Sequence, residues 1–187
     1  MHWNAPNMLT AARIAMIPVF VGLFYLPAGI MPLERANLLA TIVFVLAAIT
    51  DWLDGYLARR LNQTSNFGAF LDPVADKLMV AAALVVLVDF ERVNAVIAFI
   101  IIGREIAISA LREWMAGVGA GGKVAVATIG KIKTIAQMVA IPFLLFYQPL
   151  FGFNVAQIGT YLMIVAAMLT LISMVYYLRA AKSQLRA

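Results

Sequence analysis

The sequence has 187 residues, of which 64% are hydrophobic and only 12% charged, and its mean hydropathy is +0.95. Soluble globular domains carry about a quarter charged residues, so this composition excludes that class and indicates a one-domain polytopic membrane protein. The absence of cysteine excludes disulfides and thiolate chemistry. The net charge of +5 is better explained by basic residues at a cytoplasmic membrane face than by binding to nucleic acid.

Six apolar stretches follow one another along the chain, and each is close to the ~20 residues that cross a bilayer as a helix. They run approximately over Leu9–Ile30, Ala36–Arg60, Phe67–Asp89, Val93–Met115, Ile132–Tyr147 and Ala156–Leu178. These lengths predict an all-α fold, a bundle of six transmembrane helices that forms a single domain over residues 1–187. No small-residue cleavage site follows the first stretch, so we expect it to be retained as a helix and not removed as a signal peptide. The residues before Leu9 are compatible with a short interfacial helix.

The distribution of Lys and Arg predicts the orientation of the bundle. If the N-terminus lies in the cytoplasm, twelve of the fourteen basic residues fall on the cytoplasmic side and only Arg35 and Arg92 on the other. Basic residues accumulate at the cytoplasmic face of membrane proteins. We therefore expect both termini on that side, together with the polar stretch from Asp51 to Asp76.

Four aspartates are concentrated in this polar stretch. Asp51 and Asp54 are three residues apart, and Asp72 and Asp76 are four apart, so each pair lies on one face of its helix. The short loop between the helices predicts antiparallel neighbours whose carboxylates meet at one level. Such a cluster needs a counter-charge, and hard divalent cations such as Mg²⁺ suit carboxylates combined with substrate phosphates. Two ions would offset the charge of a diphosphate and orient it for displacement, whereas the alternative is the ion or proton relay of a cation transporter.

Small residues accompany the aspartates. Gly55 and Ala58 share the face of the second-helix pair, and Gly68 precedes the third-helix pair. They would let a ligand approach the helix backbone, or they mark helix packing. Arg59 supplies a planar donor for a phosphate or a carboxylate.

Basic residues form a second informative region. Arg104 and Arg112 are eight residues apart, about two helical turns, and therefore share a face. Lys131 and Lys133 follow at the start of the fifth stretch, at the same expected level as the aspartates. Guanidinium groups suit bidentate phosphate recognition, so this region predicts a substrate that carries a phosphate of its own. The alternatives are that Arg104 pairs with Glu105 or an aspartate, and that the lysines are ordinary cytoplasmic loop charges.

The polar stretch resembles the signature of the CDP-alcohol phosphotransferase family: Asp-x-x-Asp-Gly-x-x-Ala-Arg, eight residues, then Gly-x-x-x-Asp-x-x-x-Asp. Every signature position is matched between Asp51 and Asp76. The resemblance implies that the four aspartates bind two divalent ions, Mg²⁺ or Mn²⁺, and the CDP-linked lipid, with Asp76 as the base that deprotonates the acceptor hydroxyl. The implied reaction is phosphatidyl transfer from CDP-diacylglycerol to an alcohol with release of CMP.

Three further motifs are similar to those of the bacterial phosphatidylglycerophosphate synthases within that family. They are Asn-x-x-Asn-x-x-Thr-x-x-Arg at the start of the chain, Arg-Glu-Ile with Ser-x-Leu-Arg-Glu from Arg104, and Gly-Lys-x-Lys-Thr-x-x-Gln-Met from Gly130. The similarity implies glycerol 3-phosphate as the acceptor, a homodimer, and a bacterial cytoplasmic membrane location with the active site facing the cytoplasm. Another acceptor, such as inositol phosphate or serine, stays open.

The same similarity implies two sets of site residues. The site for the CDP-linked lipid comprises Asn7, Thr10, Asp51, Gly55, Ala58, Arg59 and Gly68. The similarity assigns Arg104, Arg112 and Lys133 to the site for the acceptor phosphate, closed by either Tyr176 or Tyr177, and the charge pattern adds Lys131.

Overall fold

The computed structural model describes residues 5–60, 66–117 and 128–184; within these ranges, the side chains of 5–7, 52, 54–60, 66–67, 69, 128–129, 131 and 180–184 lie outside the description. The described chain forms six α-helices, as the sequence predicts. They are α1 (Ala5–Tyr25), α2 (Leu33–Arg60), α3 (Asn66–Asp89), α4 (Ala95–Gly117), α5 (Thr128–Phe146) and α6 (Val155–Gln184).

Three of the described helices contain segments that are long and apolar enough to cross a membrane. These segments are Met8–Tyr25, Leu33–Asp51 and Val155–Arg179. The apolar segment of α5, Ile132–Phe146, is shorter. The all-α prediction is thus confirmed.

A proline explains why the first helix ends earlier than expected. α1 ends at Tyr25 and not at Ile30, because the residue before Pro27 is kept out of the helical region. The N–H of Ile30 then donates to the Pro27 carbonyl at 2.8 Å in a turn. Residues 5–8 form the first turn of α1. The rest of the segment in which a short interfacial helix was expected lies outside the described residues.

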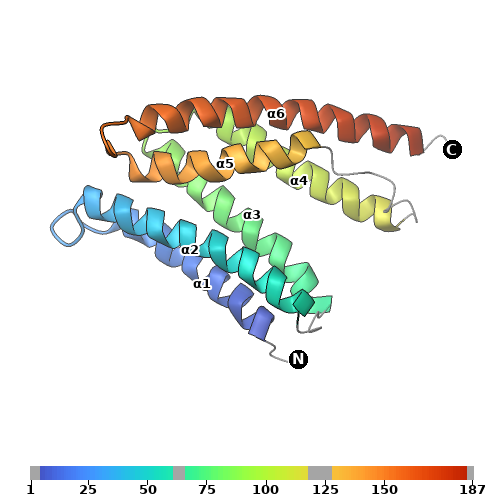
Figure 1. Cartoon of the computed structure of the whole chain (residues 1–187), viewed down its shortest axis with the longest axis horizontal. Helices are drawn as coiled ribbons and strands as arrows, with labels where there is room; N and C mark the ends of the chain where they lie inside the picture. Colours follow the sequence, from blue (N-terminus) through green and yellow to red (C-terminus); the bar gives the residue numbers. More distant parts are fainter. Residues whose placement is uncertain (1–4, 61–65, 118–127, 185–187) are drawn as a thin grey trace.

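α3 crosses diagonally between the pair α1 and α2 and the group α4, α5 and α6 (Figure 1), and it contacts α1, α2, α4 and α5. α1 packs along α2 and α3, while α5 packs along α6 and also contacts α2. The C-terminal end of α2 and the N-terminal end of α3 lie at the same end of the molecule as the start of α1 (Figure 1). Large buried side chains fill the space between the helices, among them Phe20, Phe44, Leu84, Leu87, Ile101, Ile141 and Leu144.

Gly159 allows α5 and α6 to approach closely. A Cβ at this position would lie 2.9 Å from Cγ of Leu144, 3.1 Å from Cβ of Phe143 and 3.2 Å from the carbonyl oxygen of Ala140. Small residues at helix crossings let the backbones approach in this way. The contact fixes α6 against α5, and α6 carries part of the site described below.

Arg92, in the turn between α3 and α4, joins α2 to α5 at the opposite end of the molecule. Its Nη1 donates to the carbonyl oxygens of Leu144 and Leu145 at 3.1 and 2.9 Å, and its Nη2 donates to Oδ1 of Asn37 at 2.9 Å. The last carbonyls of a helix lack partners within it, so this guanidinium caps α5. Its burial lowers the pKa of Arg92 from the ordinary value. The Tyr147 ring, 4.4 Å from the guanidinium carbon, adds a cation–π contact.

Candidate functional site

Two side chains from α1 hold two of the predicted aspartates. Nη1 of Arg13 lies 2.7 Å from Oδ1 of Asp51 on α2, and Oγ1 of Thr10 donates to Oδ1 of Asp72 on α3. Arg13 is 1% exposed and Thr10 is fully buried. Residues three apart on a helix share a face, so one face of α1 joins the ends of α2 and α3. The structure therefore brings the Thr10 region of the predicted lipid site to the aspartates.

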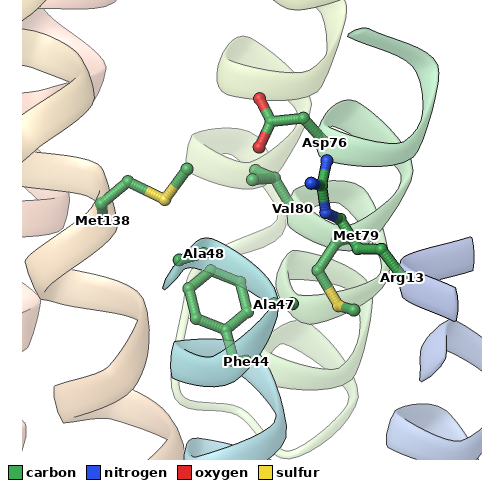
Figure 2. A pocket seen from close by; sticks show the side chains of 8 residues that line it. All are labelled: Arg13, Phe44, Ala47, Ala48, Asp76, Met79, Val80 and Met138. Carbon is green, nitrogen blue, oxygen red and sulfur yellow. The ribbon is translucent and has the colours of Figure 1, made fainter. Parts of the chain in front are cut away.

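Asp76 lies one turn after Asp72 and lines a small cavity between α1, α2, α3 and α5 (Figure 2). Arg13 reaches across from α1 so that its guanidinium lies beside Asp76, while Met138 approaches from α5 (Figure 2). Asp76 interacts electrostatically with Asp51 and Arg13 on one side and with Glu105 and Lys77 on the other. It therefore connects the aspartates to the basic region.

The described aspartates have the chemistry of a divalent-cation site without forming a complete one. Carboxylate oxygens are the ligands preferred by Mg²⁺ and similar hard cations. Within the described residues, no three acidic or histidine side chains gather closely enough to hold a metal ion jointly. The side chain of Asp54, the fourth expected ligand, lies outside the description. The metal site of four aspartates thus stays a prediction, and carboxylate oxygens are suitable ligands for it.

Several other predicted site residues also have side chains outside the described part of the chain. Gly68 is described and is buried in α3. The residues whose side chains are not described are Asn7, Gly55, Ala58, Arg59 and Lys131.

A basic cluster, defined by Arg104, Glu105, Arg112, Lys133 and Tyr177, joins α4, α5 and α6. Oε1 of Glu105 accepts hydrogen bonds from Lys133 and, at 3.3 Å, from Nη1 of Arg104. Lys133 is 2% exposed and Arg104 is 8% exposed. Arg104 therefore pairs with Glu105, as one of the alternatives from the sequence proposed. Arg104 and Lys133 nevertheless lie together, because both bind the same carboxylate oxygen.

Tyr177 completes the basic cluster from α6. Nη2 of Arg112 donates to the Tyr177 hydroxyl at 2.9 Å. The guanidinium carbons of Arg104 and Arg112 lie 5.5 and 5.3 Å from the centre of its ring. Tyr177 is 4% exposed, whereas Tyr176 is 55% exposed and faces outward. Of the two tyrosines that the sequence left open, Tyr177 is the one in contact with the arginines.

A pocket of about 60 Å³ opens between α3, α4 and α5 and shares Asp76 with the cavity of Figure 2. We call it the α3–α4–α5 pocket, and it is lined by Asp76, Lys77, Val80, Glu105, Lys133, Thr134, Gln137 and Met138. Nζ of Lys77 donates to Oγ of Ser109, which in turn donates to the Glu105 carbonyl at 2.6 Å. Two carboxylates, of Asp76 and Glu105, and two ammonium groups, of Lys77 and Lys133, therefore line one pocket.

Sequence reasoning assigned no site role to Arg13, Glu105 or Gln137. Arg13 belongs to a motif that was recognised, but its partner Asp51 is 38 residues away. The position of Gln137, one turn after Lys133, was a signal that both side chains share a face of the fifth helix.

Comparison with known proteins agrees with the family resemblance found in the sequence. Residues 3–173 match a family model described as CDP-alcohol phosphatidyltransferase. The chain is 49% identical over 187 residues to a CDP-diacylglycerol–glycerol-3-phosphate 3-phosphatidyltransferase of Shigella flexneri serotype 5b, covering 99% of this chain and 98% of that protein. Proteins of the same name from Salmonella paratyphi A and Haemophilus influenzae are 50% and 49% identical, each over 99% of this chain and over 98% and 97% of their own lengths.

Proposed function

Because the chain belongs to the CDP-alcohol phosphatidyltransferase family, we propose that it transfers the phosphatidyl group of CDP-diacylglycerol to glycerol 3-phosphate, forming phosphatidylglycerophosphate and CMP. The family predicted from the motif between Asp51 and Asp76 is confirmed by the family model. Membership in a family of transferases also leaves no support for the cation-transporter alternative.

One structural observation supports this reaction most directly. Asp76 lines both the cavity that holds Arg13 and the α3–α4–α5 pocket that holds Lys133. A carboxylate in this position can face a lipid diphosphate on one side and a phosphorylated alcohol on the other. The site is thus built for transfer between two phosphate-bearing substrates.

The acceptor half of the site follows from the basic cluster. Lys133 and Arg104 are buried cations, and the Nε of Arg104 is a buried donor with no hydrogen-bond partner among the described residues. An acceptor phosphate would supply the missing acceptor and additional negative charge. This favours glycerol 3-phosphate over an acceptor without a phosphate, such as serine or glycerol.

Asp76 takes the proton from the primary hydroxyl of glycerol 3-phosphate. The hydroxyl oxygen then bonds to the phosphorus that carries diacylglycerol, while the bond from this phosphorus to the bridging oxygen breaks and CMP leaves with that oxygen. Arg104, Arg112 and Lys133 orient the acceptor phosphate so that the hydroxyl meets Asp76.

Members of this family generally use a divalent metal. In this chain Asp51, Asp54, Asp72 and Asp76 would hold it, as two ions of Mg²⁺ or Mn²⁺. Bound there, the ions would offset the negative charge of the diphosphate as it is displaced. Thr10 and Arg13 hold the Asp72 and Asp51 carboxylates in place from α1.

The proposal places all six helices across the bacterial cytoplasmic membrane, with both termini and the site on the cytoplasmic side, in a homodimer. The distribution of basic residues supports the orientation.

An acceptor panel tests the function. Purified protein with CDP-diacylglycerol and Mg²⁺ is expected to release CMP with glycerol 3-phosphate and far more slowly with glycerol, serine or inositol phosphate. Asp76→Asn should lower kcat by roughly 10²- to 10⁴-fold, the usual contribution of general base catalysis. Asp89→Asn, an exposed aspartate at the far end of the same helix, is the matched control. A faster rate with serine or inositol phosphate would identify that compound as the acceptor in place of glycerol 3-phosphate. Near-normal activity of Asp76→Asn would show that Asp76 is not the base.

A further inference from the structure

A buried amide without a partner forms part of the wall of the α3–α4–α5 pocket. Gln137 is 4% exposed, and within the described part of the chain its Oε1 makes no hydrogen bond. Buried polar groups in native structures nearly always have a partner, because an unmet acceptor costs free energy. An apolar side chain would fill the same space without that cost. A carbonyl oxygen that lacks a hydrogen bond in a residue lining a pocket therefore indicates a ligand that donates one.

The neighbours of Gln137 indicate which donor this is. Gln137 lies one turn after Lys133 on α5, so both side chains project from the same face into the pocket. Asp76 faces them from α3. The pocket thus presents a cation, a neutral acceptor and a carboxylate.

Glycerol 3-phosphate has three groups that correspond to these. Its phosphate suits Lys133, its primary hydroxyl is the one that Asp76 deprotonates, and its secondary hydroxyl lies between them on the three-carbon chain. We propose that Gln137 is a specificity-determining residue whose carbonyl oxygen accepts a hydrogen bond from the secondary hydroxyl of the acceptor. The terminal amide turns about a single bond with a broad torsional preference, so it can present this oxygen to the pocket.

This inference rests on the proposed function, since it names how the same pocket reads its acceptor. It assigns the recognition of the acceptor's phosphate and of its middle hydroxyl to different residues. Removal of the amide should therefore affect one acceptor and not another.

The test compares glycerol 3-phosphate with 3-hydroxypropyl phosphate, which lacks only the secondary hydroxyl. Wild-type enzyme is expected to prefer glycerol 3-phosphate by about 10- to 100-fold in kcat/KM, because the analogue leaves the buried carbonyl unmet. Gln137→Met, similar in length but without the amide, should lose this preference while kcat/KM for 3-hydroxypropyl phosphate stays near the wild-type value. Gln157→Met, at an exposed position in the first turn of α6, should keep the full preference.

Two outcomes would overturn the inference while leaving the proposed function intact. One is a wild-type enzyme that uses both acceptors equally well, a result that needs no variant to fold. The other is a Gln137→Met enzyme that loses activity equally with both acceptors or keeps the preference. If the wild-type enzyme forms no product from either acceptor, the proposed function fails and the inference fails with it.

Discussion

The hydroxyl of Tyr177 on α6 accepts a hydrogen bond of 2.9 Å from Nη2 of Arg112 on α4. Arg112 is exposed, and the buried ring that it contacts also lies against Arg104. The last helix thus holds an arginine of the acceptor side in place.

Removal of that hydroxyl should weaken binding of the acceptor alone. Tyr177→Phe keeps the ring and loses a hydrogen bond to a charged group, so we expect KM for glycerol 3-phosphate to rise by roughly 3- to 10-fold, with KM for CDP-diacylglycerol unchanged. Arg112→Ala should raise the acceptor KM further. Steady-state kinetics with each substrate varied measures both constants, and Tyr176→Phe on the outward face is the control. Equal changes in the two KM values would argue against an acceptor role.

Glu105 should support Lys133. A buried ammonium that loses its carboxylate partner is left with an uncompensated charge. We expect Glu105→Gln to lower the free energy of unfolding by about 1–3 kcal/mol, and to raise the acceptor KM because Lys133 is less well held. Thermal unfolding in detergent and kinetics measure the two effects, with Glu113→Gln on the exposed face of α4 as the control. Tighter acceptor binding by Glu105→Gln would mean instead that Glu105 competes with the phosphate.

Arg92 should matter for stability and not for the reaction. Arg92→Ala removes three hydrogen bonds and leaves the last carbonyls of α5 uncapped. We expect a loss of about 2–4 kcal/mol in unfolding free energy, with both KM values unchanged at a temperature where the variant is folded. Arg35→Ala, at an exposed position, should change neither property. A selective effect of Arg92→Ala on acceptor KM would contradict the separation of this end of the molecule from the site.

Gly159→Ala should disturb the contact of α5 with α6. The added methyl group would lie 2.9 Å from the buried Leu144 side chain and close to backbone, so one helix must move. We expect destabilisation of about 1–3 kcal/mol. Gly22→Ala is the control, because nothing lies within 4 Å of that position and alanine favours the helix. If the two variants unfold at the same temperature, the α5–α6 packing is looser than the structure indicates.

The helices could be predicted because apolar stretches of membrane length are a local property of the sequence. The expected start of the third helix, Phe67, is one residue from the observed Asn66, and both end at Asp89. The family could be predicted because its motif occupies one continuous stretch.

The contacts between helices could not be predicted in the same way. Tyr176 and Tyr177 differ by one residue, or about 100° around α6, and only packing against α4 determines which one meets the arginines. The partners of Arg92 on α5 are 52 and 53 residues away. The sequence placed Arg92 on the side away from the aspartates without indicating that it caps a helix.

The proposed reaction requires attack by the acceptor hydroxyl at the phosphorus that carries diacylglycerol. Glycerol 3-phosphate labelled with ¹⁸O in its primary hydroxyl, incubated with CDP-diacylglycerol and the purified enzyme, tests this step by mass spectrometry of the products. We expect the label to be retained in phosphatidylglycerophosphate and the released CMP to be unlabelled. Formation of phosphatidic acid together with a labelled phosphodiester that joins CMP to the primary hydroxyl oxygen of glycerol 3-phosphate would show attack at the other phosphorus and would contradict this reaction.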